Sequence, residues 1–182
     1  MSALPAVVRG AGALPLVSRA LEVDPYRAPA LLVADGVTSF DNAVKNVSLR
    51  VRAGEVVALA GDDARSLASF AAVCLGAPLQ RGAIRVGAAL HARLGLHRAN
   101  LRGAAYVLDD PFAGLDAAAR ANLATRLAGL ARAGAGVLVL SRDRAALASC
   151  ADRLIVMREG RLVAEFERAE FLEFSMPGRP RA

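Results

Sequence analysis

The chain has 182 residues, is 55% hydrophobic, and carries 23 Lys+Arg against 17 Asp+Glu, which gives a formal net charge of +6. This length and apolar content fit one globular domain with a core of its own, and no apolar run is long enough to span a bilayer. The arginines are scattered and form no basic patch with interleaved aromatic residues, which argues against a nucleic-acid partner.

The N-terminal part is expected to be irregular before the first strands begin. Residues 1–28 contain Pro, Gly and Arg without clear periodicity, and nothing in them has the order of a signal peptide. Residues 30–34 (Ala-Leu-Leu-Val-Ala) predict a strand. Residues 44–52 alternate apolar and polar side chains, which predicts a half-exposed antiparallel strand.

The middle of the chain predicts alternating strands and helices. The segment 55–60 reads as a buried strand that ends at Gly61, and an alanine-rich helix is expected over 66–75. Residues 82–86 predict a short strand. Leucines at helical spacing predict a helix over 88–100.

The C-terminal half continues the alternation. A strand over 104–108 is followed by a helix over 117–133, for which Asp116 is the predicted N-cap. The remaining expected elements are a buried strand (137–140), a short helix (145–150), a hairpin (154–158 with 161–166) and a frayed basic tail (175–182). Cys74 and Cys150 fall in the predicted helices and are expected to be buried free thiols.

These units predict the fold class. Strand–helix–strand repeats with fully apolar strands indicate an α/β protein whose mostly parallel sheet is covered by helices. The early alternating strand and the late hairpin add antiparallel pieces. The expected result is a three-layer core with antiparallel β additions.

One segment points to chemistry. Val107-Leu-Asp-Asp-Pro-Phe-Ala-Gly-Leu-Asp116 runs from an apolar strand into two carboxylates, a proline and a tight turn. It resembles the Walker B and D-loop segment of ATP-binding cassette (ABC) ATPases, usually Asp-Glu-Pro-Thr-x-Gly-Leu-Asp. The resemblance implies a P-loop NTPase (RecA-like) core in which Asp109 reaches Mg²⁺ and Asp110 stands at the catalytic glutamate position. Because aspartate is one methylene shorter, polarisation of the attacking water is expected to suffer.

The resemblance also locates a phosphate-binding loop, and the loop is altered. In the family, glycines let backbone N–H groups converge on phosphate, a lysine neutralises it, and Ser/Thr holds Mg²⁺. Leucine replaces the lysine, alanine replaces the Mg²⁺ ligand, and two aspartates add negative charge. We expect this segment to be a structural turn that no longer binds a triphosphate. The alternative is that Arg65 or Ser69 takes over the role of the residues that were lost. The loop consists of Gly61, Asp62, Asp63, Ala64, Arg65, Ser66, Leu67, Ala68 and Ser69.

Two further positions match the family. Phe40 stands where an aromatic residue stacks on adenine, and the alternative for it is a core phenylalanine. Arg142 replaces the switch histidine; it cannot act as a neutral imidazole but can contact a phosphate. The interval between Gly61 and Asp109 is too short for the family's helical subdomain and signature sequence, so a truncated domain over 29–174 is expected.

The resemblance implies ATP and Mg²⁺ as cofactors, with impaired binding, and an ABC-type partner subunit and a membrane permease as partners. It implies a cytoplasmic location, at most peripheral to the inner face of the plasma membrane. Three functions remain open. They are a degenerate ABC subunit with impaired hydrolysis, an ABC ATPase acting through a composite site with a partner, and a non-catalytic interaction or regulatory module.

Overall fold

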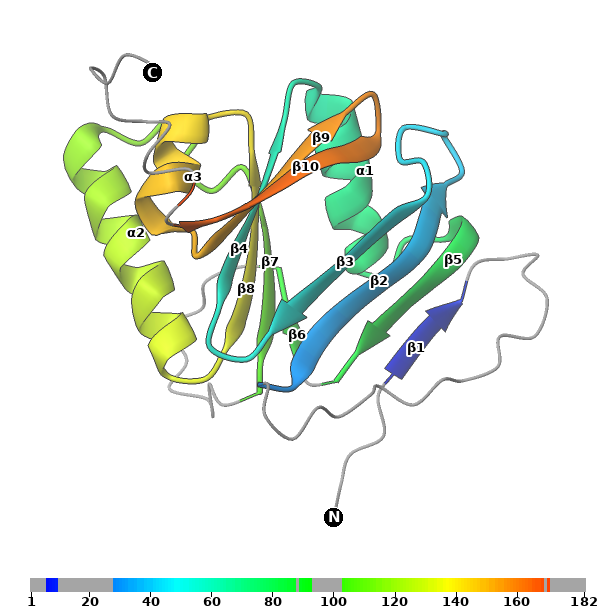
Figure 1. Cartoon of the computed structure of the whole chain (residues 1–182), viewed down its shortest axis with the longest axis horizontal. Helices are drawn as coiled ribbons and strands as arrows, with labels where there is room; N and C mark the ends of the chain where they lie inside the picture. Colours follow the sequence, from blue (N-terminus) through cyan, green and yellow to red (C-terminus); the bar gives the residue numbers. More distant parts are fainter. Residues whose placement is uncertain (1–5, 10–27, 88, 93–102, 169, 171–182) are drawn as a thin grey trace.

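The structure is a computed structural model that describes residues 6–9, 28–87, 89–92, 103–168 and 170. Within these residues two β-sheets face each other across helix α1 (Ala64–Cys74), and helices α2 (Ala117–Arg132) and α3 (Arg144–Cys150) cover the far side of the larger sheet (Figure 1). This arrangement is a layered α/β domain with a mostly parallel central sheet, which confirms the predicted fold class.

The larger sheet carries the predicted parallel strands. Among the described residues it has six strands; β9, β4, β8, β7 and β6 run parallel to one another, and β10 is antiparallel at one edge. In spatial order the strands are β10 (Arg161–Glu167), β9 (Arg153–Arg158), β4 (Val56–Gly61), β8 (Gly136–Ser141), β7 (Ala105–Asp109) and β6 (Leu90–His91).

The smaller sheet is antiparallel. Its strands, in spatial order, are β1 (Ala6–Arg9), β5 (Leu79–Val86), β2 (Ala30–Ser39) and β3 (Val47–Arg52). In β3, buried residues alternate with exposed or half-exposed ones, so one face of the sheet packs on the core. The predicted antiparallel additions are therefore present, as this sheet and as the β9–β10 hairpin.

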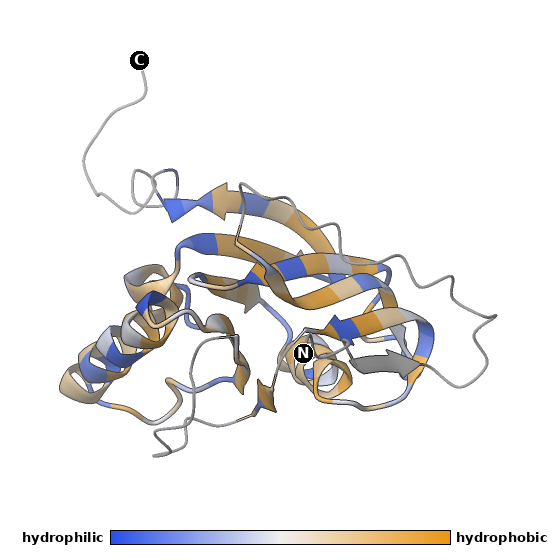
Figure 2. Cartoon of the chain, turned by 90° about the horizontal axis from the view of Figure 1, so that it is seen from below, coloured by the Kyte–Doolittle hydropathy of each residue, from blue (hydrophilic) through white to orange (hydrophobic). Residues whose placement is uncertain are grey.

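The central strands are buried on both faces and separate two hydrophobic clusters. In β4, Val57 and Leu59 face α1 and the smaller sheet, whereas Val56 and Ala58 face α2 and α3. Figure 2 shows the hydrophobic residues concentrated along the strands. Because these strands are buried on both faces, short runs of apolar residues in the sequence were enough to predict β4, β7 and β8.

A single arginine joins the two sheets at one end. The Arg153 side chain, 13% exposed, pairs with Glu165 of β10 at 2.5 Å and with Glu55 at 3.1 Å, and it also donates to the backbone carbonyl of Arg50 in β3. Its guanidinium therefore contacts the hairpin, the start of β4 and the smaller sheet.

The structure corrects several expected elements. Residues 6–9 of the expected irregular lead-in form strand β1, because their backbone pairs with β5. Strand β2 extends to Ser39, since a register shift after Ala34 accommodates the turn-like residues. The helix expected over 88–100 is wrong at Leu90–His91, which pair with β7 as β6; residues 88 and 93–100 lie outside the described part of the chain.

Other expectations are confirmed. Asp116 is the N-cap of α2 and accepts a hydrogen bond from the backbone N–H of Ala119 at 2.8 Å. Cys74 and Cys150 are buried free thiols, and burial raises the pKa of both, that of Cys150 to about 11. The basic tail lies outside the described residues. No helix in the described ranges is long and apolar enough to cross a membrane.

Candidate functional site

The candidate site lies at the carboxyl-terminal edge of the larger sheet. Strands β4, β8 and β7 are neighbours in register, with Ala60 opposite Ser141 and Asp109 opposite Leu140. The residues that follow these strands therefore meet at one edge, where α/β proteins bind ligands. The sheet thus brings the segments after Gly61, Asp109 and Ser141 together.

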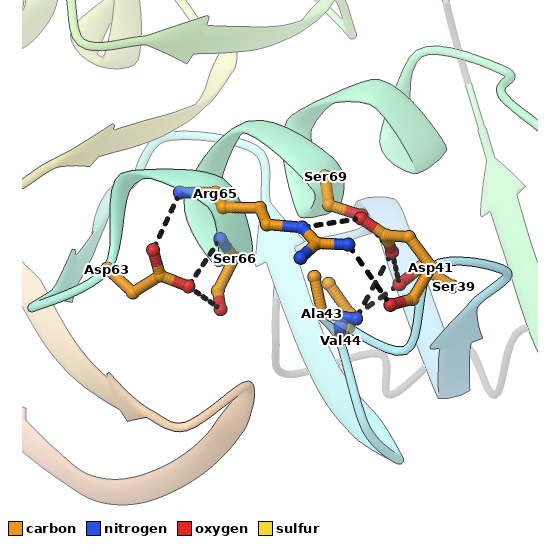
Figure 3. Close-up of polar contacts among 8 residues, drawn as sticks. All are labelled: Ser39, Asp41, Ala43, Val44, Asp63, Arg65, Ser66 and Ser69. Carbon is orange, nitrogen blue, oxygen red and sulfur yellow. Dashed lines mark hydrogen bonds and ion pairs between the residues drawn. The ribbon is translucent and has the colours of Figure 1, made fainter.

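The turn between β4 and α1 is short and is closed by its own side chain. Only Asp62 and Asp63 separate the strand from the helix. The Asp63 carboxylate accepts hydrogen bonds from the backbone N–H groups of Arg65 (3.0 Å) and Ser66 (3.1 Å) and from the Ser66 hydroxyl (2.6 Å) (Figure 3). The Ser66 hydroxyl, and after it the Arg65 N–H, hold the pKa of Asp63 below its usual range.

This geometry relocates the expected phosphate loop. Ala64, Arg65 and Ser66, placed by the sequence in a loop ahead of the helix, form the first turn of α1. The helix begins two residues earlier than predicted because Asp63 is its N-cap. Two of the N–H groups at this helix start therefore already bind a carboxylate.

Leu67, at the lysine position, belongs to the core. Its side chain is 3% exposed and lies in the cluster shared with β4 and the smaller sheet. A methyl group added at Gly61 would meet the Leu67 side chain at 2.9 Å, so the leucine fills the inside of the turn. Ala68 is exposed on α1. Neither residue offers a polar group in this position.

The aromatic residue expected at adenine is on the surface. Phe40 is 55% exposed, so the alternative that it is a core residue is wrong. Beside it, the Asp41 carboxylate accepts hydrogen bonds from the Ser39 and Ser69 hydroxyls and lies 3.4 Å from Arg65 Nε (Figure 3). Arg65 and Ser69, the two residues that could have replaced the lost phosphate-binding groups, thus both contact Asp41.

The two adjacent carboxylates after β7 have different surroundings. Partial burial, and after it the charge of Asp110, raise the pKa of Asp109. Asp110 adopts a left-handed backbone conformation (φ 44°), and its Oδ1 accepts a 2.5 Å hydrogen bond from the Ser141 hydroxyl at the end of β8. Asp110 is therefore anchored to the neighbouring strand.

The turn that follows is held by α2 and α3. Arg120 donates to the Leu115 carbonyl at 2.9 Å and to Asp143 Oδ2 at 2.7 Å, and Asp143 caps α3. Arg142, at the switch-histidine position, is exposed, and its side chain has no hydrogen-bond or ion-pair partner within the described part of the chain.

A shallow hollow adjoins this edge. Its volume is about 400 Å³, and Asp109 is the one charged residue among those that line it: Leu75, Ala92, Val107, Leu108, Asp109, Pro111 and Leu123. Among the described residues, no three His, Cys, Asp or Glu side chains gather closely enough to hold a metal ion.

The sequence missed the partners that fix these groups. The contacts Asp41–Arg65, Ser141–Asp110 and Arg120–Asp143 join residues 24, 31 and 23 positions apart, so no local spacing indicates them. One signal was available: Asp63 precedes a helical pattern, as N-cap residues do.

Comparisons with known proteins agree with the fold. The chain is 39% identical over 70 residues to the ribose import ATP-binding protein RbsA 2 of Streptomyces avermitilis, a match that covers 38% of this chain and 14% of that protein. It is 38% identical over 65 residues to the arabinose import ATP-binding protein AraG 2 of Burkholderia ambifaria, covering 36% and 12%. The matches therefore span less than a sixth of these curated relatives. No protein-family profile matches the chain.

Solved structures match over more of the chain. An ATP-binding subunit of an ABC transporter superposes with a TM-score of 0.61 at 19% identity, covering 82% of this chain and 95% of the other. A nucleotide-free ATP-binding cassette gives 0.68 at 12% identity, covering 81% and 96%. The chain therefore has the fold of the ATP-binding cassette of ABC transporters and is related in sequence, over 38% of its length, to ATP-binding proteins of sugar import.

Proposed function

We propose that the chain is an ABC-type nucleotide-binding subunit that neither binds ATP tightly nor hydrolyses it. The observation that carries this proposal is the Asp63 carboxylate at the start of α1. It occupies the N–H groups of Arg65 and Ser66. In phosphate-binding P-loops, backbone N–H groups in this place face the anion.

The residues around Asp63 do not fit a triphosphate. A phosphate would have to displace a carboxylate that already has three hydrogen bonds, beside a second carboxylate on Asp62. No lysine compensates, since Leu67 is buried in the core. Arg65 is paired with Asp41 at 3.4 Å. Charge and hydrogen bonding therefore both oppose an incoming anion.

Hydrolysis lacks its base as well. A general base must reach the attacking water within hydrogen-bond distance. Asp110 is shorter than the glutamate of the family and is bonded to Ser141. Mg²⁺, when bound in such cassettes, neutralises charge on the phosphates. Here Asp109 is the one retained side chain that could contact it, and Ala68 supplies no hydroxyl.

The partners and the location follow from the family. We propose a membrane permease and a second ABC-type subunit as partners, and a cytoplasmic site of action at the inner face of the membrane. The proposed domain is 29–174, with 175–182 as a tail and 1–28 as a lead-in from which strand β1 joins the smaller sheet.

A second function is favoured by two retained features. Asp109 remains at the end of its strand, and Phe40 is exposed and available for stacking. These would suit an ATPase acting through a composite site with a partner. The non-catalytic interaction module is the remaining alternative; it would keep the fold without a permease.

The test is nucleotide binding and turnover by the purified chain. We expect no Mg²⁺-dependent ATP hydrolysis, and no micromolar ATP binding in calorimetry. Turnover above background that disappears in Asp109→Ala would overturn the proposal, and micromolar affinity without turnover would favour the composite site. Co-purification with a membrane permease would separate a transporter subunit from an isolated module.

A further inference from the structure

The residues around Asp41 join two segments that are separate in the sequence. The loop of residues 40–46, here the Phe40 loop, connects β2 and β3 and carries the exposed Phe40. Helix α1 begins only at Ala64, after strands β3 and β4. Asp41 contacts both, and Figure 3 shows its carboxylate between the loop and the helix.

Asp41 has local contacts within the loop. Its Oδ1 accepts hydrogen bonds from the Ser39 hydroxyl (2.5 Å) and from the backbone N–H of Ala43 (3.1 Å). The Ser39 hydroxyl in turn accepts from the Val44 N–H at 3.0 Å. These bonds shape the turn and would exist without the helix.

A second set of contacts reaches α1. Ser69 Oγ donates to Asp41 Oδ1 at 3.1 Å, Arg65 Nε lies 3.4 Å from Asp41 Oδ2, and Arg65 Nη2 donates to the Asp41 carbonyl at 3.4 Å. Arg65 is the one cation in the segment from Gly61 to Ser69. Its pairing with Asp41 directs that charge toward the Phe40 loop.

The opposite end of the loop is also fixed. The Lys45 N–H donates to the Gly160 carbonyl at 2.8 Å, and a side chain on Gly160 would collide with the Ala43 carbonyl. The loop is therefore held by α1 on one side and by the β9–β10 turn on the other.

We propose that Asp41 is an internal latch. It locks the Phe40 loop and the first two turns of α1 into one rigid unit, and it keeps Arg65 away from the β4–α1 turn. The unit therefore has one conformation without any nucleotide. The inference rests on the proposed function in one respect, because it assumes that the β4–α1 turn binds no triphosphate.

The absence of tryptophan from the chain allows a site-specific test. Phe40→Trp places a single fluorophore in the loop, and acrylamide quenching reports how freely the loop opens. Against this parent, Asp41→Ala removes all the contacts of the carboxylate. The double variant Arg65→Ala/Ser69→Ala removes only those to α1 and leaves the local turn intact.

The matched control is Asp35→Ala. It ends the Arg85–Asp35 pair, which has the same 3.4 Å separation but lies in the smaller sheet away from α1. Circular dichroism and cooperative melting establish that each variant is folded. Because Arg65 and Ser69 are exposed or half-exposed, the double variant keeps the test available if Asp41→Ala does not fold.

We expect the quenching constant of the introduced tryptophan to rise about twofold in both latch variants and to stay unchanged in the control. A rise in Asp41→Ala alone would mean that Asp41 only shapes its own turn, and would overturn the latch. No rise in either variant, or an equal rise in the control, would overturn it too. Tight ATP binding by the unmodified chain would contradict the proposed function separately, since it is measured by calorimetry.

Discussion

The Ser141 hydroxyl donates to Asp110 Oδ1 across 2.5 Å and joins the turn after β7 to the end of β8. Ser141 Oγ also accepts from the backbone N–H of Asp143 at 3.1 Å, so one buried hydroxyl serves two neighbouring turns. Asp110, which the resemblance to ABC ATPases places at the position of the catalytic base, is thereby engaged in a structural contact.

Removal of this hydroxyl should destabilise the fold. Ser141→Ala leaves Asp110 and the Asp143 N–H without their partner, and we expect a loss of about 1 kcal/mol in the free energy of unfolding. Ser149→Ala is the control, because within the described ranges its exposed hydroxyl donates only to the Ala146 carbonyl; its cost should stay within about 0.5 kcal/mol. Urea denaturation measures both, and equal effects would contradict the role of Ser141.

Leu67 should behave as a core residue. Because it is 3% exposed, Leu67→Ala should cost about 2–4 kcal/mol in urea denaturation. Leu75→Ala, in a side chain 39% exposed at the end of α1, should cost less than about 1 kcal/mol. A small effect at Leu67 would mean that its side chain faces solvent, as a residue pointing toward a phosphate would.

We expect Asp63, the N-cap of α1, to contribute more to thermal stability than its neighbour Asp62. Asp63→Ala frees the N–H groups of Arg65 and Ser66, and we expect the Tm to fall by about 2–4 °C. Among the residues that the structure describes, Asp62→Ala ends only an exposed ion pair with Arg158 at 3.9 Å, and it should leave the Tm nearly unchanged. Thermal melts of the two variants, side by side, decide whether Asp63 caps the helix.

Asp41 should contribute to stability at the acid end of the pH range. The hydrogen bond from Ser39 first, together with those from Ala43 and Ser69, lowers the pKa of Asp41 from 3.8 to about 2. A lowered folded-state pKa means that this contribution is complete above the unfolded value and is lost as the pH falls through the folded one. Between about pH 4 and pH 2, Asp41→Asn should therefore lose less stability than the parent.

Urea midpoints measured across that range test this expectation. At neutral pH the urea midpoints of the parent and of Asp41→Asn should change with pH in parallel, because Asp41 is ionised in both the folded and the unfolded parent. Identical slopes in the acid range would show that the carboxylate has no such contacts in solution.

Gly160 should tolerate no side chain. It has a φ of 77° and is buried, and a methyl group there would collide with the Ala43 carbonyl. Gly160→Ala should therefore cost more than the roughly 1–2 kcal/mol of a left-handed alanine alone. Gly114→Ala provides that reference, since Gly114 has a φ of 71° and open space around it. Equal costs in urea denaturation would exclude the collision.

The fold was largely predictable because its central strands are apolar along most of their length. Strands β4, β7 and β8 are buried along almost their whole length, so short runs of consecutive apolar residues indicated them. Leu90 and His91 were misassigned because leucines at helical spacing dominated the pattern, whereas pairing with β7 decides their conformation.

The candidate site was predictable in position but not in detail. The strand ends placed Gly61, Asp109 and Arg142 at one edge. The contacts of Asp110 and Arg65 depend on Ser141 and Asp41, which come from other strands and loops. The start of α1 was placed too late because loop spacing, rather than the capping residue Asp63, set the boundary.

The guanidinium of Arg153 has a consequence for how the protein melts. It contacts β3 through the Arg50 carbonyl, the start of β4 through Glu55, and β10 through Glu165. Separating the two sheets would break the contact with the Arg50 carbonyl, and it would also remove the hydrogen bond that Glu55, the partner of Arg153, accepts from the Arg52 N–H of β3. Heating should therefore unfold both sheets in a single cooperative transition, with no intermediate in which one sheet survives alone.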